Sequence, residues 1–410
     1  MEKSKSILTA FLFSSFIYFE ELGWHSPILE TIFGIGAIYF VLTLSRLELA
    51  LSGFLVGLLW FFWIGFSMQY YGFPYLIPVV VLFFGIVYGI HFYILGYWEN
   101  IWIRAILLIL VNLFEPFGFN WFKPQIIFIN SYFGTSLLDF GLIVTGVAFA
   151  IFVQSEKRWL MPIALLFFYP AIAYPLDEVE SPNIKIKVVE TYVKQGEKWK
   201  LENQNDIVQM NFREIEKAIK EGYDMVVLPE STFPLFLNER IDILSKLLEL
   251  SSEITIWTGG LLKEGNRYYN STYLFRNGKF QIAKKVILVP FGEYIPLPDF
   301  LAKWINRIFF KGVQDFTPAT KPTDFQIGSE KFRSAICYEA TSEKMYIDSP
   351  KFIVAISNNG WFLPSIEPSL QRLLIQHYAN IYRVTIFHSA NMRGSGVVRP
   401  AKISNSLIWI

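Results

Sequence analysis

Residues 332–340, FRSAICYEA, end a predicted buried strand on the only cysteine of the 410-residue chain. A tyrosine and a glutamate follow Cys337 directly. A single cysteine cannot form an internal disulfide, and one thiol alone makes a poor metal site. Cys337 is therefore either a small side chain packed in a core or a nucleophile. The rest of the chain bears on the choice between these two interpretations.

The basic residues divide the chain into two parts. Residues 1–180 contain seven lysines and arginines, whereas the other 29 lie in the remaining residues. The first part has apolar stretches that mostly approach the ~20 residues needed by a bilayer-spanning helix, with Trp and Tyr near several ends. These stretches lie near residues 6–22, 29–46, 50–68, 75–97, 101–119, 134–154 and 158–176. Residues 1–176 are therefore predicted to form a transmembrane helical bundle of about seven spans.

The basic residues of the first part also predict its orientation. With the N-terminus inside the cell, only Lys123 lies in an outer loop, as the positive-inside rule requires. The inner segments carry Lys3, Lys5, Arg46, Arg104, Lys157 and Arg158. Seven crossings then place the rest of the chain outside the cytoplasm, in an oxidising compartment where structural cysteines normally occur in pairs. An unpaired Cys337 in that compartment favours the nucleophile.

Residues 184–410 are predicted to form an α/β sandwich, after an acidic, proline-ended linker at 177–183. Segments of strand and helix period alternate, which is typical of that class. Strands are expected at 184–193, 225–229, 254–263, 268–276, 280–289, 332–337, 352–357, 384–390 and 395–399, and helices at 206–221, 235–252 and 366–383. Asn277-Gly278 between two of the strands predicts a β-hairpin.

Three chemically distinct side chains stand at the ends of predicted strands: Glu230, Lys285 and Cys337. Together they are suited to nucleophilic catalysis. Glutamate can take the thiol proton, and lysine can lower the thiolate pKa and stabilise an oxyanion, with a backbone N–H after the cysteine as a second donor. Taken singly, Glu230 is equally a capping carboxylate and Lys285 a solvated strand lysine. Their joint placement is what favours a Cys–Lys–Glu site.

A Cys–His pair is the rival arrangement, with His377 on a predicted helix or His388 in a predicted strand. No GxSxG, HExxH, P-loop or GxGxxG motif is present, so those chemistries have no support. The net charge of +1 gives no overall field that would recruit nucleic acid.

Several motifs resemble those of a known family. They are LPEST at 228–232, Lys285 followed by LVPFGEYIPL at 288–297, CYE at 337–339, SNNGWF at 357–362 and the pair Lys198-Trp199. The second part resembles the nitrilase (carbon–nitrogen hydrolase) superfamily, whose members use a Glu–Lys–Cys triad on an αββα sandwich. The whole chain resembles the apolipoprotein N-acyltransferase family, to whose branch the LVPFGEYxPL run is specific.

The resemblance implies N-acylation of the diacylglyceryl-cysteine amino terminus of apolipoproteins, with a phospholipid acyl chain carried as a thioacyl-enzyme on Cys337. It implies Glu230, Lys285 and Cys337 as catalytic residues, and as supporting or substrate-binding residues Glu293, Tyr338, Glu339, Trp199, Asn358 and Trp361. It further implies the bacterial inner (cytoplasmic) membrane, a catalytic domain on the periplasmic face, and no metal or other cofactor. Each supporting residue also has an ordinary packing or surface role as its alternative.

The chain departs from the family pattern in three places. The usual final membrane helix has no counterpart up to Ile410, Ile287 stands where a histidine often follows the lysine, and residues 378–381 replace Arg-Ala-x-Glu. None of these changes removes a member of the triad, so activity is expected. Two other functions stay open: a membrane-tethered carbon–nitrogen hydrolase (amidase), and a non-catalytic membrane receptor or transporter with a nitrilase-like domain.

Residues 299–311, DFLAKWINRIFFK, are predicted to form a basic, aromatic amphipathic helix. Lys303, Arg307 and Lys311 share one face, and Trp304 and Phe309 lie elsewhere on the same turns. Such a helix suits a membrane interface, and packing on the domain's own core is the alternative.

Overall fold

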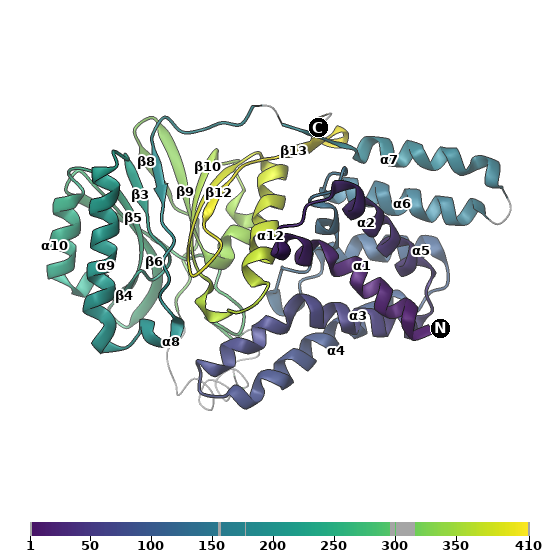
Figure 1. Cartoon of the computed structure of the whole chain (residues 1–410), viewed down its shortest axis with the longest axis horizontal. Helices are drawn as coiled ribbons and strands as arrows, with labels where there is room; N and C mark the ends of the chain where they lie inside the picture. The colour runs from purple at the N-terminus through teal and green to yellow at the C-terminus, as the bar shows by residue number, and fades with distance from the viewer. Residues whose placement is uncertain (1, 155–156, 177, 296–299, 301–315, 409–410) are drawn as a thin grey trace.

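The computed structural model describes residues 2–154, 157–176, 178–295, 300 and 316–408. A helical part and a part built on β-sheets lie side by side along the long axis of the molecule (Figure 1). The helical part ends with α7 at Ala171, and the strands of the sheet part follow.

Each of the seven apolar stretches forms helical structure. The helices are α1 (Glu2–Leu22), α2 (Pro27–Thr43), α3 (Arg46–Phe61) with η1 (Phe62–Gln69), η2 (Pro74–Leu76) with α4 (Ile77–Leu95), α5 (Ile101–Leu110) with η3 (Val111–Leu113) and η4 (Pro116–Gly118), η5 (Pro124–Phe128), α6 (Leu137–Gln154), and η6 (Arg158–Ala164) with α7 (Leu165–Ala171). Among the described residues, four helices are long and apolar enough to cross a membrane: Arg46–Gln69, Pro74–Leu95, Ile101–Gly118 and Leu137–Gln154. The number of crossings stays a prediction.

Local sequence explains how α3 begins and how it packs. Ser45 and Glu48 form a capping box at its first turn, in which each side chain bonds to the other residue's main-chain N–H. Gly57 lies against α4, where an added Cβ would come within 2.5 Å of the carbonyl oxygen of Phe84. A glycine there lets the two helices approach closely, as in membrane helix pairs.

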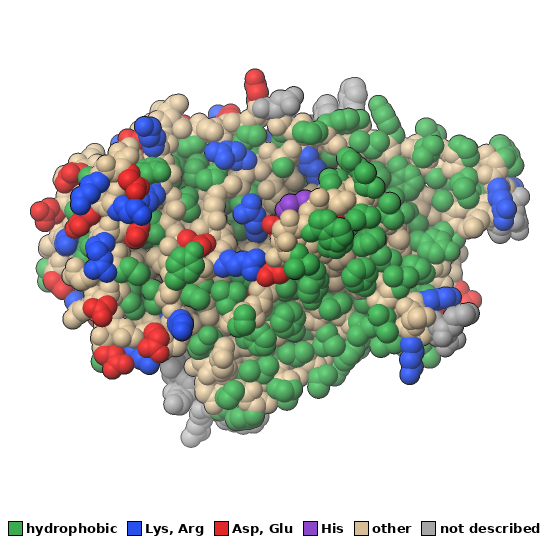
Figure 2. Space-filling view, viewed as in Figure 1, with side chains coloured by type: hydrophobic (Ala, Val, Ile, Leu, Met, Phe, Trp, Pro, Cys, Tyr) green, Lys and Arg blue, Asp and Glu red, His purple; other side chains and the backbone are tan. Residues whose placement is uncertain are grey.

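The surface differs between the two parts. On the face that Figure 2 shows, hydrophobic side chains are spread over the helical part, whereas charged side chains gather on the sheet part. Large apolar side chains on the helices are exposed, for example Leu166 and Ile86. Such a contiguous apolar surface is what a bilayer would cover.

The sheet part contains two sheets. One has the strand order β12-β11-β10-β9-β8, and the other has β2-β3-β5-β6-β7 with β4 added beside β5. The strands are β2 (Ile186–Val188), β3 (Met225–Val227), β4 (Phe233–Phe236), β5 (Thr255–Glu264), β6 (Arg267–Arg276), β7 (Lys279–Lys284), β8 (Asp324–Ile327), β9 (Glu330–Ile336), β10 (Phe352–Asn358), β11 (Thr385–Asn391) and β12 (Gly396–Val398). The hairpin at Asn277-Gly278 is confirmed, with both residues at positive φ.

The bounds of three predicted elements are wrong. The helix expected at 235–252 is α10 (Ile241–Leu250), because 233–236 pairs with β5 and that pairing outweighs the local helical spacing. The strand expected at 280–289 ends at Lys284, since the next N–H groups bond to a carboxylate instead of a strand. The strand expected at 184–193 shortens to β2, and β8 was not predicted.

The layers are two sheets face to face with helices outside, an αββα sandwich. Apolar side chains of both sheets, such as Trp257 and Phe325, fill the space between them. Helices α9 (Leu201–Lys220) and α10 cover one outer face. Helix α12 (Glu367–Tyr382) covers the other and also packs on the helical bundle through Leu370 and Leu374. One helix thus belongs to both cores and fixes the sandwich against the bundle.

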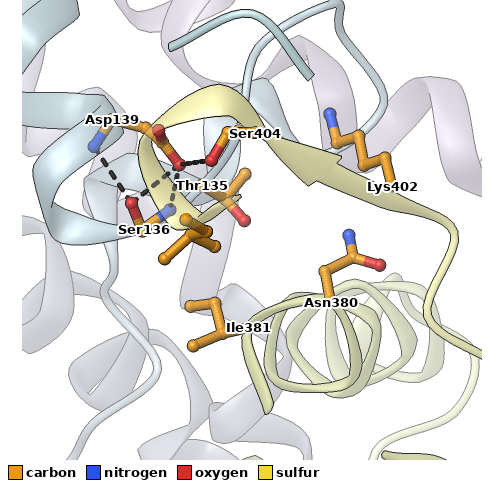
Figure 3. Close-up of a pocket in the computed structure, with 9 residues that line it drawn as sticks. Thr135, Ser136, Asp139, Asn380, Ile381, Lys402 and Ser404 are labelled. Atoms are coloured by element: carbon orange, nitrogen blue, oxygen red, sulfur yellow. Dashed lines mark hydrogen bonds between the residues drawn. The ribbon is translucent and has the colours of Figure 1, made fainter. Parts of the chain in front are cut away.

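A second junction lies near the C-terminus of the chain (Figure 3). Strand β13 (Lys402–Ser404) pairs with β1 (Ala173–Pro175), which follows α7. The carboxylate of Asp139, at the start of α6, accepts hydrogen bonds from Ser136, Ser404 and Ser406 at 2.5–3.0 Å. Lys402 donates to the carbonyls of Phe128, Ser131 and Phe133 at 2.5–2.9 Å, and burial lowers its pKa to about 7. These contacts attach the last strand to the bundle.

Replacing Asp139 by alanine is expected to cost about 2–4 kcal/mol of stability, because buried hydroxyl groups lose a charged acceptor. Thermal unfolding of the detergent-solubilised protein measures the loss. The control is Asp242→Ala, which removes an ion pair on the surface of α10, where such pairs are worth less than about 1 kcal/mol. Equal melting temperatures for the two variants would show that the junction contributes no stability.

Candidate active site

The three residues predicted to carry the chemistry all follow strands directly or closely. Glu230 follows β3, Lys285 follows β7 and Cys337 follows β9. Glu230 and Lys285 are buried, and Cys337 is half-buried. The charges of Glu230 and Lys285 both act on the Cys337 thiol. The structure therefore brings a carboxylate, an amine and a thiol from both sheets into one site.

Glu230 is fixed in position from two directions. Its Oε1 accepts a hydrogen bond of 2.7 Å from Asn270 Nδ2. Its main-chain carbonyl accepts one of 2.9 Å from Lys198 Nζ. The next residue, Ser231, has a φ of 47°, in the left-handed region that costs energy for a residue other than glycine. This conformation is held because β5 packs directly against it.

Gly259 of β5 makes that close packing possible. A Cβ on Gly259 would lie 2.5 Å from the Ser231 nitrogen and 2.8 Å from the Glu230 Cα. These are main-chain atoms, so the Glu230 segment would have to move.

Gly259→Ala is expected to lower activity at least about tenfold, since small displacements of a reacting group are costly. Turnover by the variant measures this loss. Gly260→Ala is the matched control, because its Cβ would meet only side chains at 3.2–3.4 Å. Equal activity of the two variants would exclude a positioning role for Gly259.

Lys285 and Glu293 form a buried ion pair. Lys285 Nζ lies 2.7 Å from Glu293 Oε2, and the lysine is 1% exposed. Glu293 also accepts hydrogen bonds from the main-chain N–H of Val289 and from Asn270 Nδ2 at 2.9 and 3.0 Å. Burial disfavours the ammonium, but the charges of Glu293 and Glu230 outweigh it, so the pKa of Lys285 is raised. Asn270 bridges the two carboxylates, and Lys285 stays charged.

Cys337 stands where β9 turns into the 3₁₀ helix η8 (Cys337–Thr341), with a φ of 54°. Residues held in this region are frequent at functional sites. Burial, and next the charge of Glu230, raise the pKa of the thiol well above its ordinary value, although Lys285 opposes them. The resting site is therefore a neutral thiol beside a carboxylate.

The two residues after the cysteine connect the site to its surroundings. Glu339 accepts hydrogen bonds from the N–H groups of Val286 and Ile287, the residues after Lys285, at 2.6 and 3.0 Å. It also accepts one of 2.7 Å from the N–H of Ile336. Burial raises its pKa to about 7. Glu339 thus ties the lysine segment to the cysteine strand.

Tyr338 extends from the nucleophile's turn into the helical bundle. Its ring stacks on Phe119 and Trp121, with centroids 6.2 Å away in each case. Its hydroxyl accepts from the Asn120 N–H at 2.8 Å and donates to the Gly118 carbonyl at 3.1 Å. The site therefore lies at the boundary between the sandwich and the bundle.

The other three predicted supporting residues differ in their burial and in their partners. Asn358 bonds to Gln195 and Asn391 at 2.8 Å. Trp361 stacks on Tyr71, which belongs to the connection between α3 and α4, with ring centroids 5.7 Å apart. Trp199 is 41% exposed at the end of α8 (Gln195–Lys198).

The histidines have other partners. His377 uses both ring nitrogens, at 3.1 Å from Gln125 Nε2 and 3.0 Å from Thr135 Oγ1. His388 Nε2 lies 2.8 Å from Ser357 Oγ. Burial lowers the pKa of His377 to about 3 and that of His388 to about 4. Among the described residues no hydrogen bond joins either ring to Cys337, so the Cys–His arrangement finds no support in the structure.

Two buried polar residues at the site were not predicted from the sequence: Lys198 and Asn270. Each contacts Glu230. Lys198 lies in a short polar stretch of the sequence, and Asn270 lies in a predicted strand. The predicted amphipathic helix at 299–311 lies outside the described residues except for Phe300.

The chain is similar to several known proteins. The model of the apolipoprotein N-acyltransferase integral membrane domain matches residues 1–171. Apolipoprotein N-acyltransferase from Wolinella succinogenes is 43% identical over 96% of this chain and 95% of its own, and that from Helicobacter hepaticus is 36% identical over 92% and 94%. A carbon–nitrogen hydrolase superfamily protein of known structure from Xanthomonas campestris is 14% identical, covering 54% of this chain and 83% of its own, with a TM-score of 0.38.

The protein is thus an integral membrane protein that carries an αββα sandwich domain. It belongs to the apolipoprotein N-acyltransferase family.

Proposed function

We propose that the protein transfers an acyl chain from a membrane phospholipid to the α-amino group of a diacylglyceryl-cysteine at the N-terminus of an apolipoprotein. The observation that carries this proposal is the placement of Cys337 beside Glu230 and Lys285 where the sandwich meets the bundle. Both substrates are lipids, and a site at that boundary would receive them from the membrane.

The first half-reaction acylates the enzyme. Because the resting thiol is neutral, Glu230 takes its proton as the sulfur attacks the ester carbonyl carbon of the phospholipid. The carbon–oxygen bond to the glycerol breaks, and Glu230 returns the proton to the leaving oxygen. A lysophospholipid leaves, and the acyl chain remains as a thioester on Cys337.

The second half-reaction forms the amide. The neutral α-amine of the acceptor attacks the thioester carbonyl, and Glu230 takes a proton from the amine. The carbon–sulfur bond breaks, and the proton passes to the Cys337 sulfur. The N-acylated product leaves, and the enzyme returns to its starting state. The proton transfers use only the enzyme's own side chains.

Lys285 stabilises the charge that develops in both steps. Its ammonium is permanently charged and lies in a buried site, where electrostatic stabilisation of an oxyanion is strongest. Glu293, Asn270 and Glu339 hold the lysine segment and the base in place. These three residues are thus positioning residues.

The same proposal includes the location of the protein. The distribution of basic residues favours a bundle in the bacterial inner membrane with the sandwich on its outer face. An acceptor lipoprotein anchored in the outer leaflet would reach the site there.

The fate of the acyl group tests the transferase directly. Enzyme acylated by phospholipid is separated from the donor and incubated with or without a diacylglyceryl-cysteine peptide, and products are followed by mass spectrometry. Faster loss of the thioester with the peptide, and appearance of N-acyl peptide, is the expected result. Release of free fatty acid at one rate in both samples would establish a hydrolase instead.

A further inference from the structure

A second lysine is buried at the site. Lys198, the last residue of α8, is 2% exposed, and its Nζ donates a 2.9 Å hydrogen bond to the main-chain carbonyl of Glu230. Its neighbours Trp199 and Lys200 are exposed. A buried ammonium is costly unless other groups compensate its charge.

Lys198 differs from Lys285 in how its charge is compensated. Lys285 is paired with Glu293 at 2.7 Å. Among the described residues, no carboxylate oxygen lies within 4.0 Å of Lys198 Nζ. The charges that act on it are those of Glu230 and Cys337. Lys198 therefore places an ammonium against the main chain of Glu230, and no carboxylate oxygen of the described residues pairs with it directly.

We propose that Lys198 is a positioning residue of the acyl-transfer site, holding Glu230 by its main-chain carbonyl and stabilising the thiolate that forms on Cys337. This inference rests on the proposed function, and it adds a second cation to the site.

The surroundings of Lys198 contain few other titratable groups. Glu230 faces it from the segment after β3, and Cys337 from the turn after β9. Tyr70 of the bundle lies 4.0 Å from the position of a Cβ on Gly196, in the same short helix, and burial keeps that phenol neutral. Lys285 acts on the same glutamate and the same thiol. Of these described groups, Lys285 stays charged and Tyr70 stays largely neutral between pH 7 and 9.5, because the pKa of each is raised.

The charge of Lys198 is lost within an accessible pH range. Burial lowers its pKa to about 8, although Glu230 and Cys337 oppose the shift. The ammonium is present at pH 7 and largely absent at pH 9.5. The neutral amine still donates an N–H to the Glu230 carbonyl. A charge effect on Cys337 therefore disappears as the pH rises, whereas a purely structural effect does not.

Alkylation of Cys337 measures this effect without reference to acyl transfer, because the chain has one cysteine. The full-length protein in detergent is treated with iodoacetamide at pH 7.0 and 9.5, and the modified peptide is quantified. Lys198→Gln keeps an N–H donor and removes the charge. It is expected to slow alkylation about tenfold at pH 7.0, since a nearby opposite charge shifts a pKa by about one unit or more.

At pH 9.5 the rates of the Gln variant and the wild type should agree within about twofold, because the wild-type lysine is then neutral. Lys198→Arg keeps the charge at both pH values and should react at the wild-type rate at pH 7.0. Lys200→Gln, on the exposed neighbouring lysine, should leave both rates unchanged.

A rate ratio between wild type and Lys198→Gln that is the same at both pH values would overturn the proposal. So would an unchanged rate at pH 7.0. Failure of acyl transfer itself would appear separately, as the absence of a thioester in the wild type, and would not alter the alkylation rates.

Discussion

Replacing Glu230 by glutamine is expected to slow formation of the acyl thioester about 10²- to 10⁴-fold, the usual contribution of a general base. Glutamine has nearly the same shape, and its oxygen can keep the 2.7 Å hydrogen bond from Asn270. It cannot take the thiol proton. Because the resting thiol of Cys337 is neutral, attack without a base begins from the unreactive form. Single-turnover acylation by labelled phospholipid measures the effect.

A carboxylate on the surface provides the control for the Glu230 variant. Glu239 pairs with Lys263 at 3.0 Å, and its side chain is 50% exposed. Glu239→Gln should acylate at the wild-type rate. Both variants should unfold at the wild-type temperature. If Glu230→Gln acylated normally, Glu230 would be a structural residue and another base would be required.

Replacing Lys285 by methionine is expected to have two separate effects. It removes the cation that stabilises the oxyanion, which should lower turnover about 10³-fold. It also leaves the buried carboxylate of Glu293 without its partner, which costs about 3–5 kcal/mol when a buried pair is broken. Activity assays and thermal unfolding of the same preparation measure the two effects.

The double variant Lys285→Met/Glu293→Gln separates stability from chemistry. Neutralising Glu293 removes the uncompensated charge, so most of the lost stability should return. The turnover should remain low, because no cation is restored. Recovery of activity in the double variant would show that Lys285 serves only to neutralise Glu293.

Much of the fold follows from patterns that involve neighbouring residues only. The apolar stretches, the Asn277-Gly278 turn and the helix at 366–383 depend on local spacing and turn chemistry, and the structure contains all of them. β4 and β8 depend on partners distant in the chain. β7 ends early because Glu339, 53 residues beyond Val286, takes the N–H group that a strand would pair. No local pattern contains that information.

The same distinction applies to the site. Glu230, Lys285 and Cys337 were recognisable because each reactive side chain closes a predicted strand and stands in a motif. Lys198 and Asn270 contact Glu230 from α8 and β6. Lys198 stands in the Lys198-Trp199 motif, but the local pattern does not indicate that either side chain is buried. The location of Tyr338 among the bundle's aromatic residues also required the structure, since Phe119 and Trp121 lie over 200 residues earlier.

The most direct test of the central claim is mass spectrometry of the intact protein after incubation with phospholipid, with Cys337→Ala as the control. The account predicts a mass increase of one acyl chain, located on the peptide that contains Cys337, absent from the Cys337→Ala variant and released by hydroxylamine. A folded wild-type protein that gains no acyl group from any phospholipid, or that gains it equally in Cys337→Ala, would contradict the account.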